Sequence, residues 1–166
     1  LEVAGGFDER FSMAWREDSD LEFKFIRKGI PIRYLPVATV IHPVRPARWG
    51  SSLKDQRKGM FNALLYHKFP ELYKAKIRQA PPTLYYLMIF LFTGGLVFLF
   101  KGQIAAAQWL LFTWTFCWLY FSYKRLENTS RSWPHIFEML YTSAFIPFLS
   151  VFWHFYGVIR YRTFFI

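Results

Sequence analysis

The chain has 166 residues, of which 54% are hydrophobic and 22% aromatic, while only 19% are charged. This composition excludes a disordered chain and argues against a purely soluble domain. Half of the net charge of +10 lies in residues 51–82, directly before the hydrophobic half, where it suits anionic lipid; without a zinc finger, RNP motif or basic zipper, we expect no nucleic acid partner.

The polar beginning of the chain predicts a short helix followed by two strands. A capping box at Ser19 and Glu22 and a stop at Gly29 predict a helix over residues 20–28. The runs IPIRYL and VATVIH, within residues 30–42, are rich in β-branched residues and predict strands. Because no charged-then-apolar leader precedes this part, we expect the sequence to be the C-terminal part of a longer protein.

Two acidic residues just before this helix are candidates for chemistry. Glu17 and Asp18 precede the helix N-terminus, where the positive end of the macrodipole keeps carboxylates ionised. An ionised carboxylate at the end of a loop can accept a proton, although stabilisation of the helix is the alternative. Asp18 and Asp20 also match the Asp-x-Asp pattern of nucleotide-linked metal sites, but capping explains Asp20 better.

The string around these acids resembles a known family. Residues 5–43 read GGFDERFSMAWREDSDLEFKFIRKGIPIRYLPVATVIHP. This segment resembles the acceptor side of family 2 glycosyltransferases, in which a Gly-Gly-Phe-Asp-Glu-x-Phe turn precedes Glu-Asp-x-Asp-Leu at the start of a helix. The resemblance implies an α/β GT-A fold, with residues 1–50 as the acceptor-side end of the catalytic domain. It also implies inverting transfer of a sugar from a nucleotide-sugar donor to a lipid-linked or glycan hydroxyl, as in cell-envelope polysaccharides.

The same resemblance assigns roles to individual residues. It implies that Asp18 is the base that deprotonates the acceptor hydroxyl, with Glu17 as its neighbour. The further candidates for substrate binding are Gly5, Gly6, Trp15, His42, Gln56 and Arg57. Gly5 and Gly6 could instead form a simple turn, Trp15 could simply pack, and His42 could be structural.

Gln56 and Arg57 keep part of a Gln-x-x-Arg-Trp motif whose last two positions hold Gly59 and Met60 here, which favours transfer of a single sugar. The family also implies a divalent metal, Mg or Mn, with ligands mainly in a donor half outside this sequence. These residues alone are therefore expected to be inactive. The alternative function is a non-catalytic membrane anchor with a cytoplasmic segment that docks a partner.

Residues 51–82 alternate apolar and basic side chains in a roughly helical pattern. The pattern predicts two amphipathic helices on the membrane surface, interrupted at Pro70. Such a layer would hold an active site close to the lipid headgroups.

Residues 83–166 predict a transmembrane region. Residues 84–100 and 104–123 carry no charge and are long enough to span, and the short link between them predicts an antiparallel hairpin. The single cysteine, Cys117, lies here and excludes an intrachain disulfide or a cysteine zinc site. Residues 136–159 form a third apolar segment, interrupted by Pro147, that we expect to span with a kink, an interfacial position being the alternative.

The distribution of lysine and arginine predicts orientation. With three crossings, six basic residues flank the membrane on the side of residues 1–82 and three on the other. The positive-inside rule then places residues 1–82 in the cytoplasm and the C-terminus outside it. We therefore expect an integral protein of the bacterial inner or plasma membrane.

Overall fold

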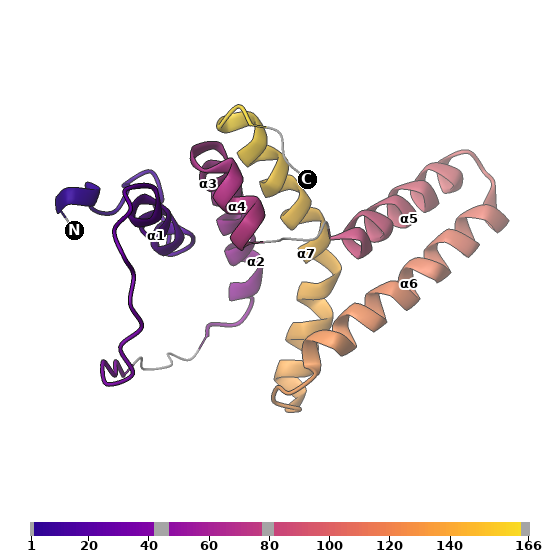
Figure 1. Ribbon diagram of the computed structural model, residues 1–166. Coiled ribbons are helices and arrows are strands. Elements are labelled where there is room, and N and C mark those ends of the chain that lie inside the picture. The colour runs from indigo at the N-terminus through magenta and orange to yellow at the C-terminus, as the bar shows by residue number, and fades with distance from the viewer. Residues whose placement is uncertain (1, 42–46, 78–81, 164–166) are drawn as a thin grey trace. The chain divides into compact units, whose positions relative to one another are not determined.

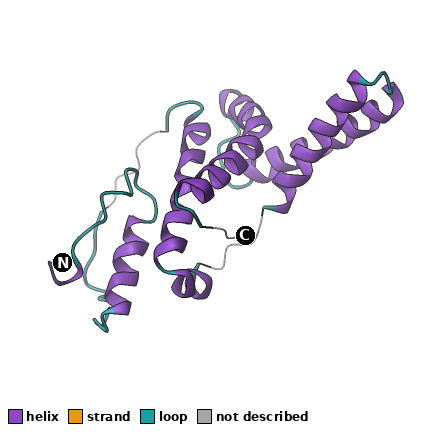
Figure 2. Ribbon diagram, turned by 90° about the horizontal axis from the view of Figure 1, so that it is seen from above, coloured by secondary structure: helices purple, strands orange, loops and turns teal. Residues whose placement is uncertain are grey.

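The computed structural model describes residues 2–41, 47–77 and 82–163, and its regular elements in these ranges are helices (Figures 1 and 2). In chain order they are η1 (Glu2–Ala4), α1 (Glu17–Arg27), α2 (Ser51–Asp55), η2 (Gln56–Gly59), α3 (Met60–Lys68), α4 (Pro70–Lys76), α5 (Thr83–Phe100), α6 (Ile104–Leu126) and α7 (Trp133–Arg160). The chain forms two compact units. The first comprises residues 1–48, 58–79 and 154–166, and the second residues 49–57 and 80–153.

The first unit has a small apolar core built from α1, α3 and the residues that flank them. Phe23 of α1 and Phe61 of α3 are fully buried. Phe23 meets the ring of Phe69 edge-on at 5.7 Å, and Phe61 lies 5.7 Å from the ring of Phe11. Burial of each such side chain stabilises the fold by about 1.5–3 kcal/mol, so these contacts hold α1 against α3.

The ends of α1 test the predicted helix signals. The helix begins at Glu17 rather than residue 20, and its N-cap is Arg16 without a side-chain capping bond, so the predicted capping box at Ser19 and Glu22 is wrong. The predicted stop at Gly29 is confirmed. Gly29 has φ of +67°, and the backbone N–H groups of Gly29 and Ile30 donate to the carbonyls of Ile26 and Phe25, both at 3.0 Å. This pair of bonds is a Schellman motif.

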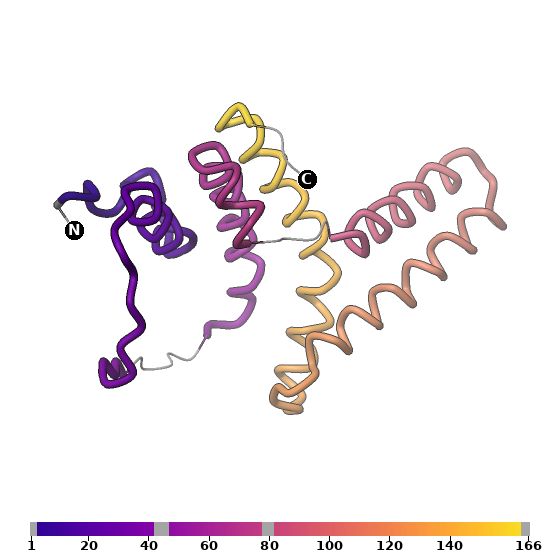
Figure 3. The backbone as a smooth tube through the Cα atoms, viewed as in Figure 1, coloured from indigo at the N-terminus to yellow at the C-terminus, as the bar shows by residue number. Residues whose placement is uncertain are grey.

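The predicted strands, and with them the α/β fragment, are wrong. Residues 30–41 form turns and irregular extended backbone (Figure 3). Residues 31–41 are exposed throughout. No strand occurs anywhere in the three described ranges. Since a β-strand is stable only when its backbone groups pair with a neighbouring strand, the β-branched composition of residues 30–42 is not enough to form one.

In the second unit, α5 and α6 form an antiparallel hairpin (Figure 1). At about 1.5 Å per residue, their 18 and 23 residues are about 27 and 34 Å long, against a hydrocarbon core of about 30 Å. Gly102, at φ of +72°, makes the turn between them. Gly95 lets the helices approach closely, because a Cβ there would lie 2.7 Å from the side chain of Leu111.

The surface of this hairpin is that of a membrane element. Large apolar side chains such as Phe90, Phe100 and Trp109 are exposed to between 67% and 88%. The hydroxyl groups of Thr93 and Thr113 donate to carbonyls one turn back at 2.7 and 2.9 Å, so these polar groups are satisfied inside their own helix. By length and composition α5, α6 and α7 could each cross a membrane. The protein is therefore membrane-associated.

Candidate functional site

Asp18 and Glu17 lie in the first turn of α1 and line a small cavity. The cavity has a volume of about 160 Å³ and is formed by residues 14–19. The Asp18 side chain is exposed, and its Oδ1 accepts hydrogen bonds from the backbone N–H of Ser19 at 2.7 Å and from the Ser19 hydroxyl at 3.4 Å. The same cavity is bordered by Trp15, which is 41% exposed. An exposed carboxylate and an indole thus share one polar concavity.

The backbone just before the two acids has a strained conformation. Arg16 has φ of +73°, in the left-handed region that side chains other than glycine rarely adopt. The residue is held by Asn62 of α3, whose Oδ1 accepts from Arg16 Nε at 2.8 Å and from Trp15 Nε1 at 3.1 Å. Since Asn62 is itself 6% exposed, it is a fixed anchor for the loop that presents Glu17 and Asp18.

Glu17 contributes a second feature. Its Oε2 is buried and has no hydrogen-bond partner among the described residues. A buried acceptor without a donor costs about 1–3 kcal/mol, so a native structure that keeps one calls for an explanation. A hydroxyl group bound in the adjoining cavity would supply the missing donor.

Asp20, two residues after Asp18 in α1, has a structural role as a buried, ion-paired carboxylate. It is fully buried and forms ion pairs with Lys24, at 3.0 Å, and with Lys68 of α3. Lys68 also pairs with Asp8 at 2.6 Å, and Asp8 with Arg10 at 2.7 Å. The hydrogen bonds from Arg10, helped by Lys68, hold the pKa of the Asp8 carboxyl well below its usual value.

These ion pairs argue against a metal site at Asp18 and Asp20. A carboxylate already shared by two lysine ammonium groups is a poor ligand for a divalent cation, so the Asp-x-Asp pattern does not fit a metal site here. Nor does the part of the chain that the structure describes hold any group of three or more metal-ligating His, Cys, Asp or Glu side chains.

The predicted glycines lie in the first unit. Gly5 and Gly6 both have positive φ, +75° and +64°, so they form a turn that other residues would strain. The Gly6 carbonyl accepts a hydrogen bond from Lys24 Nζ at 2.9 Å, which ties this turn to α1. His42 lies outside the described residues.

Gln56 is the first residue of η2 and Arg57 is the second, and both lie in the second unit. Gln56 Nε2 donates to the carbonyl of Ser52 at 2.9 Å, one turn back. The Arg57 guanidinium lies 5.5 Å from the centroid of the Trp153 ring of α7, in cation–π geometry. Both side chains therefore have local partners in the second unit.

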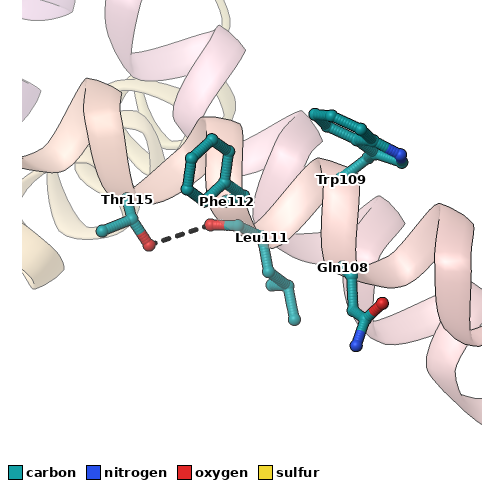
Figure 4. Close-up of a pocket in the computed structure, with 5 residues that line it drawn as sticks. All are labelled: Gln108, Trp109, Leu111, Phe112 and Thr115. Carbon is teal, nitrogen blue, oxygen red and sulfur yellow. Dashed lines mark hydrogen bonds between the residues drawn. The ribbon is translucent and has the colours of Figure 1, made fainter.

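A larger cavity, of about 640 Å³, lies along α6 (Figure 4). It is lined by Gln108, Trp109, Leu111, Phe112 and Thr115. The Thr115 hydroxyl is already bonded to the Leu111 carbonyl at 2.9 Å, and the remaining lining is mostly apolar. As part of a hairpin suited to lipid, this surface offers no constellation for catalysis.

Asn62 and Lys68 are the residues that sequence reasoning missed. Asn62 lies inside the apolar run MFNALL, and a single amide in such a run is a signal for a buried polar contact. The partners of both residues are 46 to 60 positions away, and nothing local identifies them.

No protein-family model matches the chain, and neither the curated proteins nor the solved structures contain a significant match. Functional inference therefore depends on the residues themselves.

Proposed function

We propose that this protein is a membrane-anchored glycosyltransferase in which Asp18 is the base that accepts the proton of the acceptor hydroxyl. In the reaction, the acceptor oxygen forms a bond to the anomeric carbon of the sugar while the bond from that carbon to the nucleoside diphosphate breaks. The leaving diphosphate takes the electron pair, and the hydroxyl proton passes to the Asp18 carboxylate. Attack opposite the leaving group inverts the anomeric carbon.

One observation carries the proposal: an exposed carboxylate borders a cavity whose loop is held in a strained conformation. Strained backbone clusters at functional sites because the surrounding structure must over-determine it. Here Asn62 supplies that constraint through its two bonds to Trp15 and Arg16. The observation agrees with the family 2 resemblance of residues 5–43.

The other lining residues suit a sugar. The Trp15 ring, which is 41% exposed and has the Arg16 guanidinium 5.0 Å from its centroid, can pack on the apolar face of a pyranose ring, as aromatic side chains do with an amphipathic ligand. The unpartnered Oε2 of Glu17 can accept a hydrogen bond from a sugar hydroxyl and so orient the acceptor beside Asp18.

The membrane hairpin favours a lipid-linked acceptor. Residues 51–77 carry a high density of lysine and arginine next to α5, which attracts anionic headgroups. We place this side in the cytoplasm of a bacterial cell, where nucleotide-sugar donors are found. The unmatched positions Gly59 and Met60 favour addition of a single sugar.

The test is turnover by the full-length, membrane-embedded protein. With a panel of nucleotide sugars and a membrane lipid extract as acceptor, we expect release of nucleoside diphosphate from one donor. Asp18→Asn should lower the rate by at least about 100-fold, the usual contribution of a general base. It should leave donor binding, measured separately, unchanged.

The matched control is Glu9→Gln, which neutralises an exposed carboxylate outside the cavity and should leave turnover unchanged. Near-normal turnover by Asp18→Asn would refute the base assignment. If the unaltered full-length protein releases no diphosphate with any donor, the enzymatic proposal is wrong and a non-catalytic anchor is the better description.

A further inference from the structure

α7 has two chemically distinct faces. Phe137, Tyr141, Phe145 and Phe152, at spacings of four, four and seven residues, are between 47% and 62% exposed. Residues at these spacings share one face of a helix. The buried side of the helix carries the apolar residues Met139 and Ile146 together with the polar residues Thr142 and Ser143. The helix thus has an aromatic side that is about half-exposed and a buried side that includes polar groups.

The residues just before the first span lie along α7. The Gly50 N–H donates to Glu138 Oε1 at 2.8 Å, and the Trp49 ring lies 5.3 Å from that of Tyr141. Further along the helix, Arg57 lies over the ring of Trp153. All these contacts are within the second unit, so residues 49–57 accompany α7 from residue 138 to residue 153.

A half-buried arginine strengthens this attachment. Arg125, in the last turn of α6, donates to the hydroxyl groups of Thr142 and Ser143 at 2.7 and 2.8 Å. Its other terminal nitrogen donates to the Ser52 hydroxyl of α2 at 3.2 Å. One guanidinium therefore joins α2, α6 and α7.

This arrangement conflicts with a membrane-spanning α7. From residue 138 to residue 153 the helix is about 22 Å long, most of the hydrocarbon thickness of about 30 Å. If α7 crossed the bilayer, residues 49–57 would be carried in beside it, with the charged side chains of Lys54, Asp55 and Arg57. At about 2.5–3.5 kcal/mol for each charge near the bilayer centre, the cost would reach roughly 7–10 kcal/mol.

α7 is also joined to the hairpin by side-chain contacts. Trp118 Nε1 donates to the Leu140 carbonyl at 2.9 Å, and Arg125 lies one or two turns further toward the end of α6. Phe92, at the middle of α5, lies 5.5 Å from the ring of Phe148.

The basic residues give an independent argument. If α7 does not cross, Arg160 and Arg162 join the side that already holds Lys74, Lys76, Arg78, Lys124, Arg125 and Arg131. The number of lysine and arginine residues then changes from six on the side of residues 1–77 and three on the far side to eight and one, and only Lys101 remains on the far side. The positive-inside rule is therefore obeyed more strongly with two crossings than with three.

We infer that α7 lies in the plane of the membrane interface and that both its ends are on the same side as residues 1–77. Its aromatic face, defined as Trp49, Phe137, Tyr141, Phe145 and Phe152, binds the boundary between headgroups and acyl chains of the bilayer. Aromatic side chains are suited to this boundary. The inference uses none of the catalytic assignments and stands independently of them.

The first test measures sidedness. In a Cys117→Ser background, single cysteines are introduced by Ser12→Cys, Gln103→Cys and Thr163→Cys and labelled with a membrane-impermeant maleimide before and after permeabilisation. We expect residues 12 and 163 to label together and residue 103, at the tip of the hairpin, to label from the opposite side. Labelling of residue 163 together with residue 103 would overturn the inference.

The second test measures depth. Nitroxide labels at Phe137→Cys, Phe145→Cys and Phe152→Cys are compared, through collisions with oxygen and with a nickel chelate, in vesicles that contain phosphatidylglycerol. We expect all three at one shallow depth, about 5–10 Å below the headgroups. The control is a set of labels on the spanning helix α5, at Tyr86→Cys, Phe90→Cys and Val97→Cys. Along this helix the depth of the label should first increase toward the bilayer centre and then decrease. A similar gradient along α7 would contradict the in-plane position.

Discussion

Arg16 positions the loop before Glu17 and Asp18 by adopting a strained backbone conformation that lowers the stability of the fold. Its left-handed backbone aims the chain into α1 directly before Glu17 and Asp18, and its Nε donates to Asn62. A Cβ in this conformation costs roughly 1–2 kcal/mol, which glycine avoids. The side-chain bond to Asn62 opposes that cost.

Two substitutions at Arg16 separate these contributions. Arg16→Ala and Arg16→Gly both remove the guanidinium, but only alanine keeps the Cβ. We therefore expect Arg16→Gly to be more stable than Arg16→Ala by about 1 kcal/mol, measured by hydrogen exchange of the α1 amides in the membrane-embedded protein. Equal protection in both variants would mean that this conformation is not strained.

Asp8 makes the first unit sensitive to acid. Because its pKa is lowered in the folded protein, its ion pairs stabilise the fold above the unfolded pKa of about 3.9, and this stability is lost as the pH falls below that value. We expect the protease resistance of α1 to decrease from about pH 4 downwards, and Asp8→Asn to weaken this dependence. Glu9→Gln is the control and should behave as the unaltered protein does. A pH profile unaffected by Asp8→Asn would exclude this role.

At the scale of elements, two helix glycines differ in what a Cβ atom added to them would contact: backbone atoms in one case and a side chain in the other. A Cβ on Gly157 of α7 would lie 2.6 Å from the carbonyl oxygen and 2.8 Å from the Cα of Met60, at the start of α3. A Cβ on Gly94 of α5 would meet only the end of the Leu110 side chain, at 3.4 Å. Backbone cannot move aside as a leucine side chain can.

Gly157→Ala and Gly94→Ala should therefore have opposite effects on the stability of the protein. Both substitutions gain up to about 1 kcal/mol of helix propensity. We expect Gly94→Ala to be neutral or stabilising and Gly157→Ala to destabilise the protein by roughly 1–3 kcal/mol, as overpacked sites do. The measurement is thermal unfolding in detergent, followed by protease cleavage near the end of α7. A stabilised Gly157→Ala variant would contradict the close contact with Met60.

At the scale of the whole molecule, membrane attachment depends on two kinds of helix. α5 and α6 satisfy their backbone and hydroxyl groups internally and expose apolar side chains, as a span requires. α7 is also long and apolar enough to cross, yet it carries polar groups, Glu138 and Thr142, that are bonded to Gly50 and Arg125. Length and hydropathy alone do not separate these two kinds, because both measures ignore which face a side chain occupies.

The candidate site was predictable in part. Glu17, Asp18 and Trp15 are neighbours in the sequence, and the structure brings them to one cavity. The anchoring role of Asn62 was not predictable, since its partners lie 46 and 47 positions away. The burial of Asp20 likewise depends on Lys68, a residue of another helix.

By itself, the sequence determined that the chain is membrane-associated, that its long apolar runs are helical and that α1 ends at Gly29. Those properties follow from hydropathy, length and the conformational freedom of glycine, which act over a few neighbouring residues. Only the tertiary structure decided that residues 30–41 form no strand, that Asn62 holds the loop before Asp18 and that residues 49–57 lie along α7. These depend on partners distant in the chain, because hydrogen bonds and packing contacts form only when both groups are brought together in space.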